Sequence, residues 1–288
     1  MKEKDMINGG TGVCALIGDP VAHTLSPFIH NSLSECEGIN SVYTAFRVRR
    51  GDTGTALKGA FALGIRGFNV TVPHKEDVIP FLCELDPDAK GIGAVNTLCL
   101  TDKGYKGYNT DVSGFIREIR ECGFDIRGER VIMLGAGGAA NAVLYALYSL
   151  GAEGVYILNR SVQKAEEKFG SDKRNRILPL DGFEEIEEEG YFCVQCTSAG
   201  LFPDTGTVPI EDESFYRKID RAVDIIYNPY ETEFMKRVKR NGGRAVNGLD
   251  MLLFQAVESF KLFHDTLVSE ESIATVRERL KERVYGRQ

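Results

Sequence analysis

The amino-acid sequence predicts a two-domain α/β protein, one domain of which is a doubly wound parallel sheet. Three observations predict this class. The chain has 288 residues, which at roughly 150 residues per domain is enough for two hydrophobic cores. Short β-branched runs alternate with segments of helical periodicity along the chain, a pattern typical of parallel sheets covered by helices. A glycine-rich turn at 135–140 also separates a strand-like run from a helix-like one.

The charge balance excludes some partners. Lysine and arginine total 35 against 42 for aspartate and glutamate, a formal net charge of −7. Nucleic acid is therefore not expected as a partner, because binding to a phosphate backbone draws on a basic surface. The uncharged run 131–152 is long enough to cross a bilayer, but glycines and an asparagine interrupt it, so no membrane span is expected.

The start of the chain and its cysteines indicate a compartment. The first residues lack the apolar stretch of an export signal. The seven cysteines are odd in number and scattered, which favours reduced thiols over a disulfide framework. We therefore expect a cytoplasmic protein.

The first half of the chain is expected to alternate strands and helices. A helix should begin at Ser26, because Pro27 suits a first helical turn. Pro73 should end the last strand of this half, since it lacks the N–H that a ladder needs. The pattern predicts strands at 14–17, 41–48 and 67–72 and a further helix at 55–63.

The second half has the rhythm of a doubly wound sheet. Helices are expected at 112–122 and 139–150, and strands at 130–134, 154–158, 191–197 and 222–226. A helical segment that begins near Leu249 follows the last strand, and we infer that the chain returns there to the first domain. The predicted domains are therefore 1–112 with 249–288, and 113–248.

The glycine-rich turn fits the dinucleotide-binding pattern G-x-G-x-x-A. It consists of Gly135, Ala136, Gly137, Gly138, Ala139 and Ala140. The first glycine allows a tight turn, the second lets the backbone approach a pyrophosphate, and the small last residue permits close packing of helix on strand. A lone motif of this kind is weak, but its strand–loop–helix setting predicts a Rossmann-type domain that binds a dinucleotide.

The end of the next strand favours NADP over NAD. An NAD site usually has an acid there for the ribose 2′-hydroxyl, whereas this chain has Asn159 and Arg160, with Lys164 one helical turn further. A guanidinium can bind a 2′-phosphate through paired hydrogen bonds. The alternative is an ordinary surface Arg and Lys at the start of a helix.

Polar residues gather at one predicted strand end in the first half. Asn69 and Thr71 share a face of their strand, and His74 and Lys75 follow at its C-terminal end, where α/β proteins usually bind ligands. Taken singly, Lys75 is equally well read as a surface lysine and Asn96 as a turn residue.

The set of motifs resembles the shikimate dehydrogenase family. The resembling segments, in the family's order and over nearly the whole chain, are IGDPVAHTLSPFIHN (17–31), FNVTVPHKE (68–76), GAVNTL (93–98), GYNTDVSGF (107–115), GAGGAA, NRS (159–161), CTSAGL (196–201), DIIYNP (224–229) and NGLDMLLFQA (247–256). The resemblance implies an NADP-dependent reduction of 3-dehydroshikimate to shikimate, on the route to aromatic amino acids. It also implies a substrate domain and an NADP domain with a cleft between them, in a monomer or homodimer.

Site residues follow from the motif match. Lys75 and Asp111 are expected to form the catalytic pair. The substrate pocket is expected to contain Thr24, Ser26, Thr71, Lys75, Asn96, Asp111, Tyr227 and Gln255. The cofactor is expected to contact Gly135, Ala136, Gly137, Gly138, Ala139, Asn159, Arg160, Ser161, Lys164, Thr197 and Gly248. No His, Cys or carboxylate trio has ligand spacing, so no metal is expected.

The chemistry of shikimate suits these residue types. Thr24, Ser26 and Tyr227 can donate hydrogen bonds to its carboxylate, and amide and carboxylate side chains can hold its ring hydroxyls. In the reduction, a Lys75 ammonium would stabilise the charge that develops on the carbonyl oxygen and donate the proton. We treat Lys75 and Asp111 as one coupled acid/base unit. The alternative is that Lys75 only binds and orients the substrate.

Several positions depart from the family's usual pattern. Thr24 replaces a serine and adds a methyl group on the carboxylate side, which leaves acceptance of quinate open. His74 replaces a phenylalanine beside Lys75, and a packed, neutral ring is expected there. The milder departures are the Gln195-Cys196 pair, Leu201 and Ser161. Two other functions stay open: a quinate/shikimate dehydrogenase that works oxidatively, with NADP or with NAD, and an NADP-binding sensor without turnover.

Overall fold

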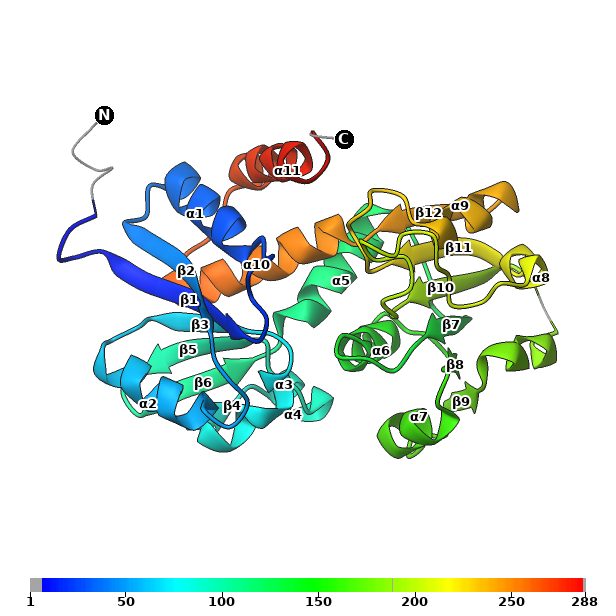
Figure 1. Ribbon diagram of the computed structural model, residues 1–288, viewed down its shortest axis with the longest axis horizontal. Helices are drawn as coiled ribbons and strands as arrows, with labels where there is room; N and C mark the ends of the chain where they lie inside the picture. Colours follow the sequence, from blue (N-terminus) through cyan, green and yellow to red (C-terminus); the bar gives the residue numbers. More distant parts are fainter. Residues whose placement is uncertain (1–6, 188, 287–288) are drawn as a thin grey trace. The chain divides into compact units, whose positions relative to one another are not determined.

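The computed structural model describes residues 7–187 and 189–286. The chain forms two compact units: the first takes the residues up to Gly114 and those from Leu253 onward, and the second takes Phe115–Leu252. Both divisions fall inside long helices, α5 (Thr110–Glu121) and α10 (Leu249–His264), which are labelled in Figure 1. The predicted divisions lie two residues (114 − 112) and four residues (252 − 248) earlier, because the sequence marks where a helix starts and not where its packing changes.

The first unit is built on a mixed six-stranded sheet of order β2-β1-β3-β5-β6-β4. Its strands are β1 (Gly12–Gly18), β2 (Ser41–Arg47), β3 (Gly67–Val70), β4 (Glu84–Leu85), β5 (Thr97–Thr101) and β6 (Gly104–Tyr108). β1 pairs in parallel with β2 and β3, whereas β5 runs antiparallel to both β3 and β6. The predicted strand 67–72 ends two residues early, at Val70, because the Thr71 carbonyl accepts a hydrogen bond from the His74 N–H and the chain turns.

Helices cover both faces of this sheet. They are α1 (Ser26–Glu37), α2 (Thr53–Ala62), α3 (His74–Asp77), the 3₁₀ turn η2 (Ile79–Phe81), α4 (Pro87–Ile92) and α11 (Glu270–Tyr285), together with the later part of α10. Strand β1 divides its side chains between two cores: Ala15 and Ile17 pack with Leu57 of α2, while Cys14 and Leu16 pack with Phe263 of α10. This period-two alternation is what buries both faces of a central strand.

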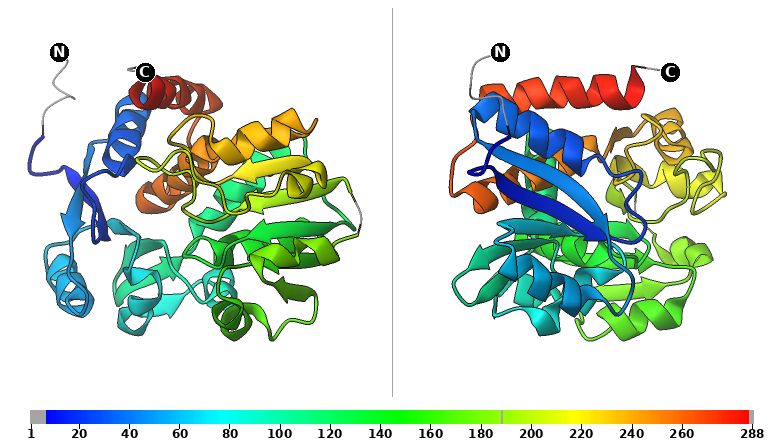
Figure 2. Two further views of the ribbon diagram at one scale, coloured as in Figure 1. Left: turned by 45° about the vertical axis from the view of Figure 1, so that its right-hand side comes forward. Right: turned by 60° about the vertical axis from the view of Figure 1, so that its left-hand side comes forward.

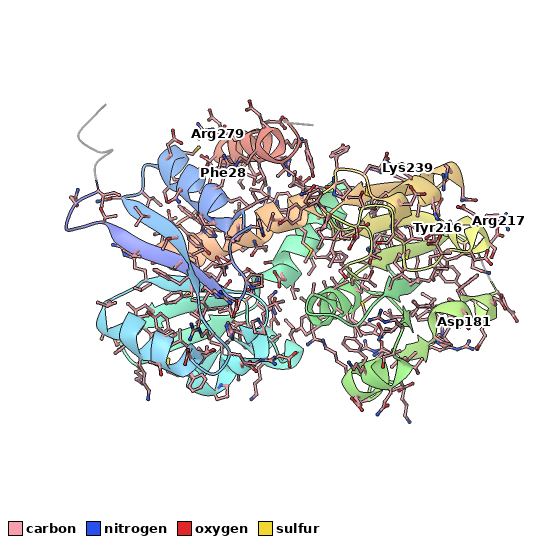
Figure 3. The ribbon with its side chains drawn as sticks, in the orientation of Figure 1. Phe28, Asp181, Tyr216, Arg217, Lys239 and Arg279 are labelled. Atoms are coloured by element: carbon pink, nitrogen blue, oxygen red, sulfur yellow. The ribbon has the colours of Figure 1, made fainter. Side chains whose placement is uncertain are left out.

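The last helix packs against the first. In the left view of Figure 2, α1 in blue and α11 in red lie side by side. Arg279, labelled with Phe28 in Figure 3, pairs with Glu35 of α1 at 2.7 Å, and the Arg283 guanidinium lies 5.6 Å from the centre of the Phe28 ring. The C-terminal residues thus complete the unit that the N-terminal residues begin.

The second unit is a six-stranded sheet of order β12-β11-β10-β7-β8-β9 in which all neighbouring strands are parallel. Its strands are β7 (Arg130–Leu134), β8 (Gly154–Leu158), β9 (Asn175–Leu178), β10 (Tyr191–Gln195), β11 (Ile219–Asp224) and β12 (Arg244–Asn247). Numbered from β7, this order reads 3-2-1-4-5-6, which is the dinucleotide-binding order of the Rossmann fold.

The helices of this unit bury the sheet. They are α6 (Ala140–Ser149), α7 (Val162–Phe169), the 3₁₀ segment η3 (Leu180–Glu185), α8 (Glu213–Arg217) and α9 (Glu233–Arg240), together with the later part of α5. Tyr216, labelled in Figure 3, is fully buried in the core with Phe215 and Phe234, and its hydroxyl donates to the Ile210 carbonyl at 2.6 Å. None of the helices in the described ranges is long and apolar enough to span a membrane.

Candidate active site

The strand order of the first unit brings three separate segments to one edge of its sheet. β3 and β6 run toward that edge and β5 starts from it, so that Thr97 pairs with Asn69 on one side and with Tyr108 on the other. The segments that follow β3, precede β5 and follow β6 therefore converge. They contain the predicted site residues Lys75, Asn96 and Asp111.

Lys75 and Asp111 form an ion pair at this edge. Lys75 lies in α3 and Asp111 in the first turn of α5, and the Lys75 Nζ donates to the Asp111 Oδ2 at 2.5 Å. Their side chains are 19% and 12% exposed, so the pair is mostly shielded from water. The backbone holds both residues: the Lys75 carbonyl accepts from the Val95 N–H at 2.9 Å, and the Asp111 N–H donates to the Asn109 side chain at 3.1 Å.

Asn96 holds the other carboxylate oxygen of Asp111. The Asn96 Oδ1 accepts from the Thr110 backbone N–H at 2.7 Å, and because an N–H can only donate, this contact fixes which way the amide points. The Asn96 Nδ2 then donates to the Asp111 Oδ1 at 2.8 Å and to the Thr110 hydroxyl at 3.0 Å. Asp111 is thus held by a cation on one oxygen and an amide on the other.

A chain of buried hydrogen bonds links the predicted carboxylate-binding hydroxyls to the same region. Thr24 and Ser26 stand at the start of α1, where their hydroxyls lie 3.2 Å apart. Ser26 hydrogen-bonds the Tyr43 phenol, whose pKa is raised well above its usual value by burial and lowered to a smaller extent by that bond. The Tyr43 hydroxyl donates to the Asn69 Oδ1 at 2.7 Å, and Asn69 is buried beside Thr97.

The remaining predicted pocket residues divide between the units. Thr71 follows β3 in the first unit, and its N–H donates to the Ile17 carbonyl at 3.0 Å. Gln255 lies on α10 in the first unit and is 9% exposed. Tyr227 follows β11 in the second unit, where burial raises the pKa of its phenol.

His74 is a structural residue of the first unit. It is completely buried, and its Nε2 lies 2.7 Å from the Val48 carbonyl, which can only accept, so Nε2 carries a proton. The Nδ1 lies 3.2 Å from the Thr53 hydroxyl. The ring is therefore packed and hydrogen-bonded on both nitrogens, as expected for a structural histidine beside Lys75.

The glycine-rich turn of the second unit follows β7 as predicted. Gly135 has φ +97°, and a β-carbon there would lie 2.7 Å from the Thr197 methyl group and 3.3 Å from the backbone of Cys196. Helix α6 starts at Ala140, which is fully buried. The turn thus needs glycine at its first position and leads directly into the N-terminus of a helix, as in a pyrophosphate-binding turn.

The predicted cationic residues lie beside this turn, because β8 pairs with β7 up to Leu158 and Leu134. The Asn159 Nδ2 donates to the Ser161 carbonyl at 2.8 Å, and the Ser161 hydroxyl caps α7. Arg160 is exposed and makes no ion pair with any described residue. Lys164 is exposed in the first turn of α7.

A second lysine at the glycine-rich turn was not predicted from the sequence. Lys168, one helical turn beyond Lys164, donates to the carbonyls of Ala136 and Gly137 at 3.3 and 3.1 Å. Its position follows from the length of α7 and from the pairing of β7 with β8. No motif marks it, because a lysine near the end of an amphipathic helix is common.

Two further residues predicted to contact the cofactor stand at strand ends of the same sheet. Thr197 follows β10, and its N–H donates to the Gln195 Oε1. Gly248 follows β12, where a β-carbon would lie 2.4 Å from the Ile225 carbonyl oxygen, so only glycine fits. Both residues lie at the carboxyl edge of the sheet, as Gly135 does.

Two family models match the chain. Residues 16–98 match the substrate binding domain of shikimate dehydrogenase, and residues 118–202 match the shikimate/quinate 5-dehydrogenase model. The NADP(+) shikimate dehydrogenase of Moorella thermoacetica is 43% identical over 265 residues, which is 89% of each chain. The chain belongs to the shikimate dehydrogenase family. The resemblance drawn from its motifs is confirmed.

Solved structures of this family share the fold. A chorismate mutase/shikimate 5-dehydrogenase fusion protein from Clostridium acetobutylicum has a TM-score of 0.90 at 34% identity and covers 95% of this chain and 98% of its own. A shikimate dehydrogenase in complex with NADP+ has a TM-score of 0.87, also at 34% identity, and covers 97% and 98%. The predicted α/β fold class is thereby confirmed.

The second unit fits the cofactor of this family. A β-carbon at Gly135 would clash with Thr197, and the N-terminus of α6 supplies positive potential. The exposed guanidinium of Arg160 stands where an NAD site would have an acid. These features suit a pyrophosphate and a 2′-phosphate.

Proposed function

We propose that this chain catalyses the reversible, NADP-dependent reduction of 3-dehydroshikimate to shikimate, with Lys75 and Asp111 as its acid/base pair. The observation that carries the proposal is the 2.5 Å contact of Lys75 with Asp111, whose second oxygen is held by Asn96. An ammonium group placed at a strand end and braced by a carboxylate is suited to protonate an alkoxide. The same three residues lie in the family's motifs.

The reaction needs a hydride and a proton. NADPH, when bound, supplies the hydride to the substrate carbonyl carbon. As negative charge develops on the carbonyl oxygen, the Lys75 ammonium stabilises it and transfers a proton to it. Asp111 balances the charge of Lys75 before the transfer and orients its Nζ; in the oxidative direction, Lys75 takes the proton back.

Neutral donors suit the substrate carboxylate and hydroxyls. Thr24 and Ser26 present hydroxyls at the start of α1, and the family's motifs assign the Tyr227 phenol to the same ligand. Thr71 and Gln255 are assigned to ring hydroxyls. In the structure both amide protons of Asn96 are used by Asp111 and Thr110, so Asn96 binds the substrate by exchanging one of these contacts.

The cofactor is assigned to the second unit. The backbone of Gly135, Ala136, Gly137, Gly138 and Ala139 contacts the pyrophosphate, Arg160 and Lys164 contact the 2′-phosphate with Ser161, and Thr197 and Gly248 line the nicotinamide side. We place the reaction in the cytoplasm, in keeping with seven cysteines that are all free thiols.

The test is the initial rate of NADP+ reduction by the purified protein. Shikimate and quinate are each assayed with NADP+ and with NAD+. Shikimate with NADP+ is expected to exceed the other pairs by about 100-fold or more, since a missing 2′-phosphate contact and a misfitting hydroxyl each leave groups unpaired. Lys75→Ala should lower kcat by roughly 10³-fold, because general acid–base catalysis is worth about 10²–10⁴-fold.

Lys58→Ala is the matched control. Lys58 is an exposed lysine on α2 of the same unit, so its loss should leave the rate within about twofold. Comparable rates with quinate or NAD+ would instead favour a quinate/shikimate dehydrogenase. No turnover with any pair, despite binding of NADP+, would overturn the proposal in favour of a sensor.

A further inference from the structure

Three hydroxyl groups meet in the interior of the first unit, and two of them hydrogen-bond the Asn96 amide. Thr97 is the first residue of β5, Thr110 the first of α5, and Ser259 lies on α10. Their oxygens are 2.8 Å (Thr97–Ser259), 3.0 Å (Thr110–Ser259) and 3.2 Å (Thr97–Thr110) apart. All three residues are at most 4% exposed. We refer to Thr97, Thr110 and Ser259 as the hydroxyl triangle.

Every hydroxyl of the triangle has an acceptor for its proton. The Thr97 hydroxyl donates to the Asn96 Oδ1 at 2.9 Å and the Ser259 hydroxyl to the Gln255 carbonyl at 2.9 Å. The Thr110 hydroxyl has two acceptors within reach, Ser259 at 3.0 Å and the Asn96 Oδ1 at 3.2 Å. The lone pairs are used as well: the Asn69 Nδ2 donates to Thr97 at 3.1 Å and to Ser259 at 2.8 Å. Buried polar groups left unpaired are costly, so removing one of these hydroxyls leaves its neighbours without a partner.

The hydrogen bonds of this set point toward the catalytic carboxylate. Donation runs from the Tyr43 hydroxyl to Asn69, from Asn69 to Thr97, and from Thr97 to the Asn96 Oδ1. The Asn96 Nδ2 then donates to Asp111. Each donated bond polarises the next donor, so the series strengthens the last bond, which ends on an anion.

We propose that Thr97 and Ser259 are positioning residues for the acid/base pair, which act through the Asn96 amide to hold the Asp111 carboxylate against Lys75. The proposal rests on the proposed function, because it assigns the triangle a role in the step that Lys75 and Asp111 perform. Neither hydroxyl touches the reacting atoms. Thr97 fixes the amide plane of Asn96, and Ser259 connects α10 to β5 and α5.

The test compares two substitutions at one position. Thr97→Val keeps the shape and removes the hydroxyl, whereas Thr97→Ser keeps the hydroxyl and removes a methyl group. Thr97→Val should lower kcat roughly tenfold, as expected for an unpaired buried acceptor next to the catalytic group, and change the KM for shikimate by less than about threefold. Thr97→Ser should restore kcat to within about twofold of the parent.

Ser259→Ala is the second variant, and Ser34→Ala is its control. Ser34 is a buried serine of α1 in the same unit, and its hydroxyl contacts Ser41 outside the triangle. Ser259→Ala should lower kcat by about threefold to tenfold and raise the solvent deuterium isotope effect on kcat, since a misplaced acid slows the proton transfer. Ser34→Ala should leave both values unchanged. The circular dichroism spectrum and the thermal unfolding of each variant, compared with the parent, check that the first unit is folded.

The outcomes separate this proposal from the function on which it rests. If Lys75→Ala abolishes turnover but Thr97→Val and Thr97→Ser have equal kcat values, the triangle serves packing alone and the positioning role is wrong. If Thr97→Ser is as impaired as Thr97→Val, the lost methyl and not the hydroxyl matters, and the proposal is also overturned. If Lys75→Ala keeps its turnover, the proposed function itself fails.

Discussion

Two buried aspartates, one in each unit, show how differently the same side chain is used at the end of a strand. Asp111 follows β6 and is paired with the Lys75 ammonium. Asp224 ends β11, is completely buried, and among the described residues contacts only neutral donors: the Thr232 hydroxyl at 2.6 Å, the Ile226 N–H at 3.0 Å and the Gln195 Nε2 at 3.4 Å. Burial raises the pKa of Asp224 from 3.8 to about 7, although these donors act in the opposite direction.

The difference in partners separates Asp111, which is assigned to the reaction, from Asp224, which has a structural role. Asp111 is held by a cation that the proposed reaction uses, and it stays partly accessible at the sheet edge. Asp224 joins two loops of the second unit, because it accepts from Ile226 after β11 and from Gln195, whose own amide donates to the Ala199 carbonyl at 3.0 Å. A carboxylate at a strand end is therefore not by itself a sign of catalysis.

The largest expected effect is on the pH dependence of stability in Asp224→Asn. The unfolded carboxyl releases its proton near pH 3.8 and the folded one near 7, so folding takes up a proton between these values. The free energy of unfolding should therefore fall as the pH rises from about 4 to about 7. Asparagine mimics the protonated acid, with an amide that donates to Thr232, and removes this loss.

Chemical denaturation at pH 4.5 and at pH 8 measures the difference between variant and parent. That difference should shift in favour of Asp224→Asn by about 3 kcal/mol, because roughly 2.4 pKa units of the linkage, at 1.36 kcal/mol each, fall between these two pH values. Asp204→Asn, a change at an exposed aspartate of the same unit, should show no such shift. A constant difference at both pH values would mean that Asp224 is ionised in the folded protein throughout.

The two units also differ in how far their sites follow from the sequence. In the second unit, the glycine turn and Arg160 are local features, so the strand–loop–helix pattern alone predicts them. In the first unit, Lys75, Asn96 and Asp111 come from separate motifs, and the family resemblance was needed to combine them. The sheet order then explains why they meet.

Residues that act through long-range contacts could not be predicted. Ser259 is 162 positions from Thr97 and sits on a helix whose neighbours are apolar core residues, so the sequence gives it no distinguishing signal. Lys168 and Asp224 are similar cases, because one depends on the length of α7 and the other on two loops that fold over it. Spacing predicts which residues share an element, whereas partners across elements depend on the packing of the whole unit.

The second-largest expected effect is that of Gly135→Ala on cofactor binding. It tests whether the cofactor site depends on the backbone geometry of the glycine-rich turn. Gly135→Ala should lower the affinity for NADP+ by about 100-fold and destabilise the second unit by about 1–2 kcal/mol, because φ +97° strains any side chain and the β-carbon would lie 2.7 Å from the Thr197 methyl group. Titration of NADP+ binding and thermal unfolding measure the two losses.

A second substitution separates the two causes. Thr197→Ser removes the methyl group and keeps the hydroxyl that accepts from the Ala199 N–H, so in the Gly135→Ala background it should relieve the clash and leave the strain. Gly206→Ala, at a glycine with nothing within 4 Å of an added β-carbon, should be silent. Full affinity in Gly135→Ala would show that the turn tolerates a side chain.

The smallest expected effect is that of removing the Arg160 charge on the affinity for NADP+. Arg160→Ala should weaken NADP+ binding about tenfold and leave NAD+ binding within about twofold, because only NADP+ carries the 2′-phosphate that a guanidinium binds. Raising the salt concentration should narrow the gap between parent and variant, since exposed charges are screened. Lys173→Ala, a change at another exposed lysine of this unit, is the control. Equal losses for both cofactors would mean that Arg160 contacts a group they share, and the source of NADP preference would then be sought at Lys164 or Lys168.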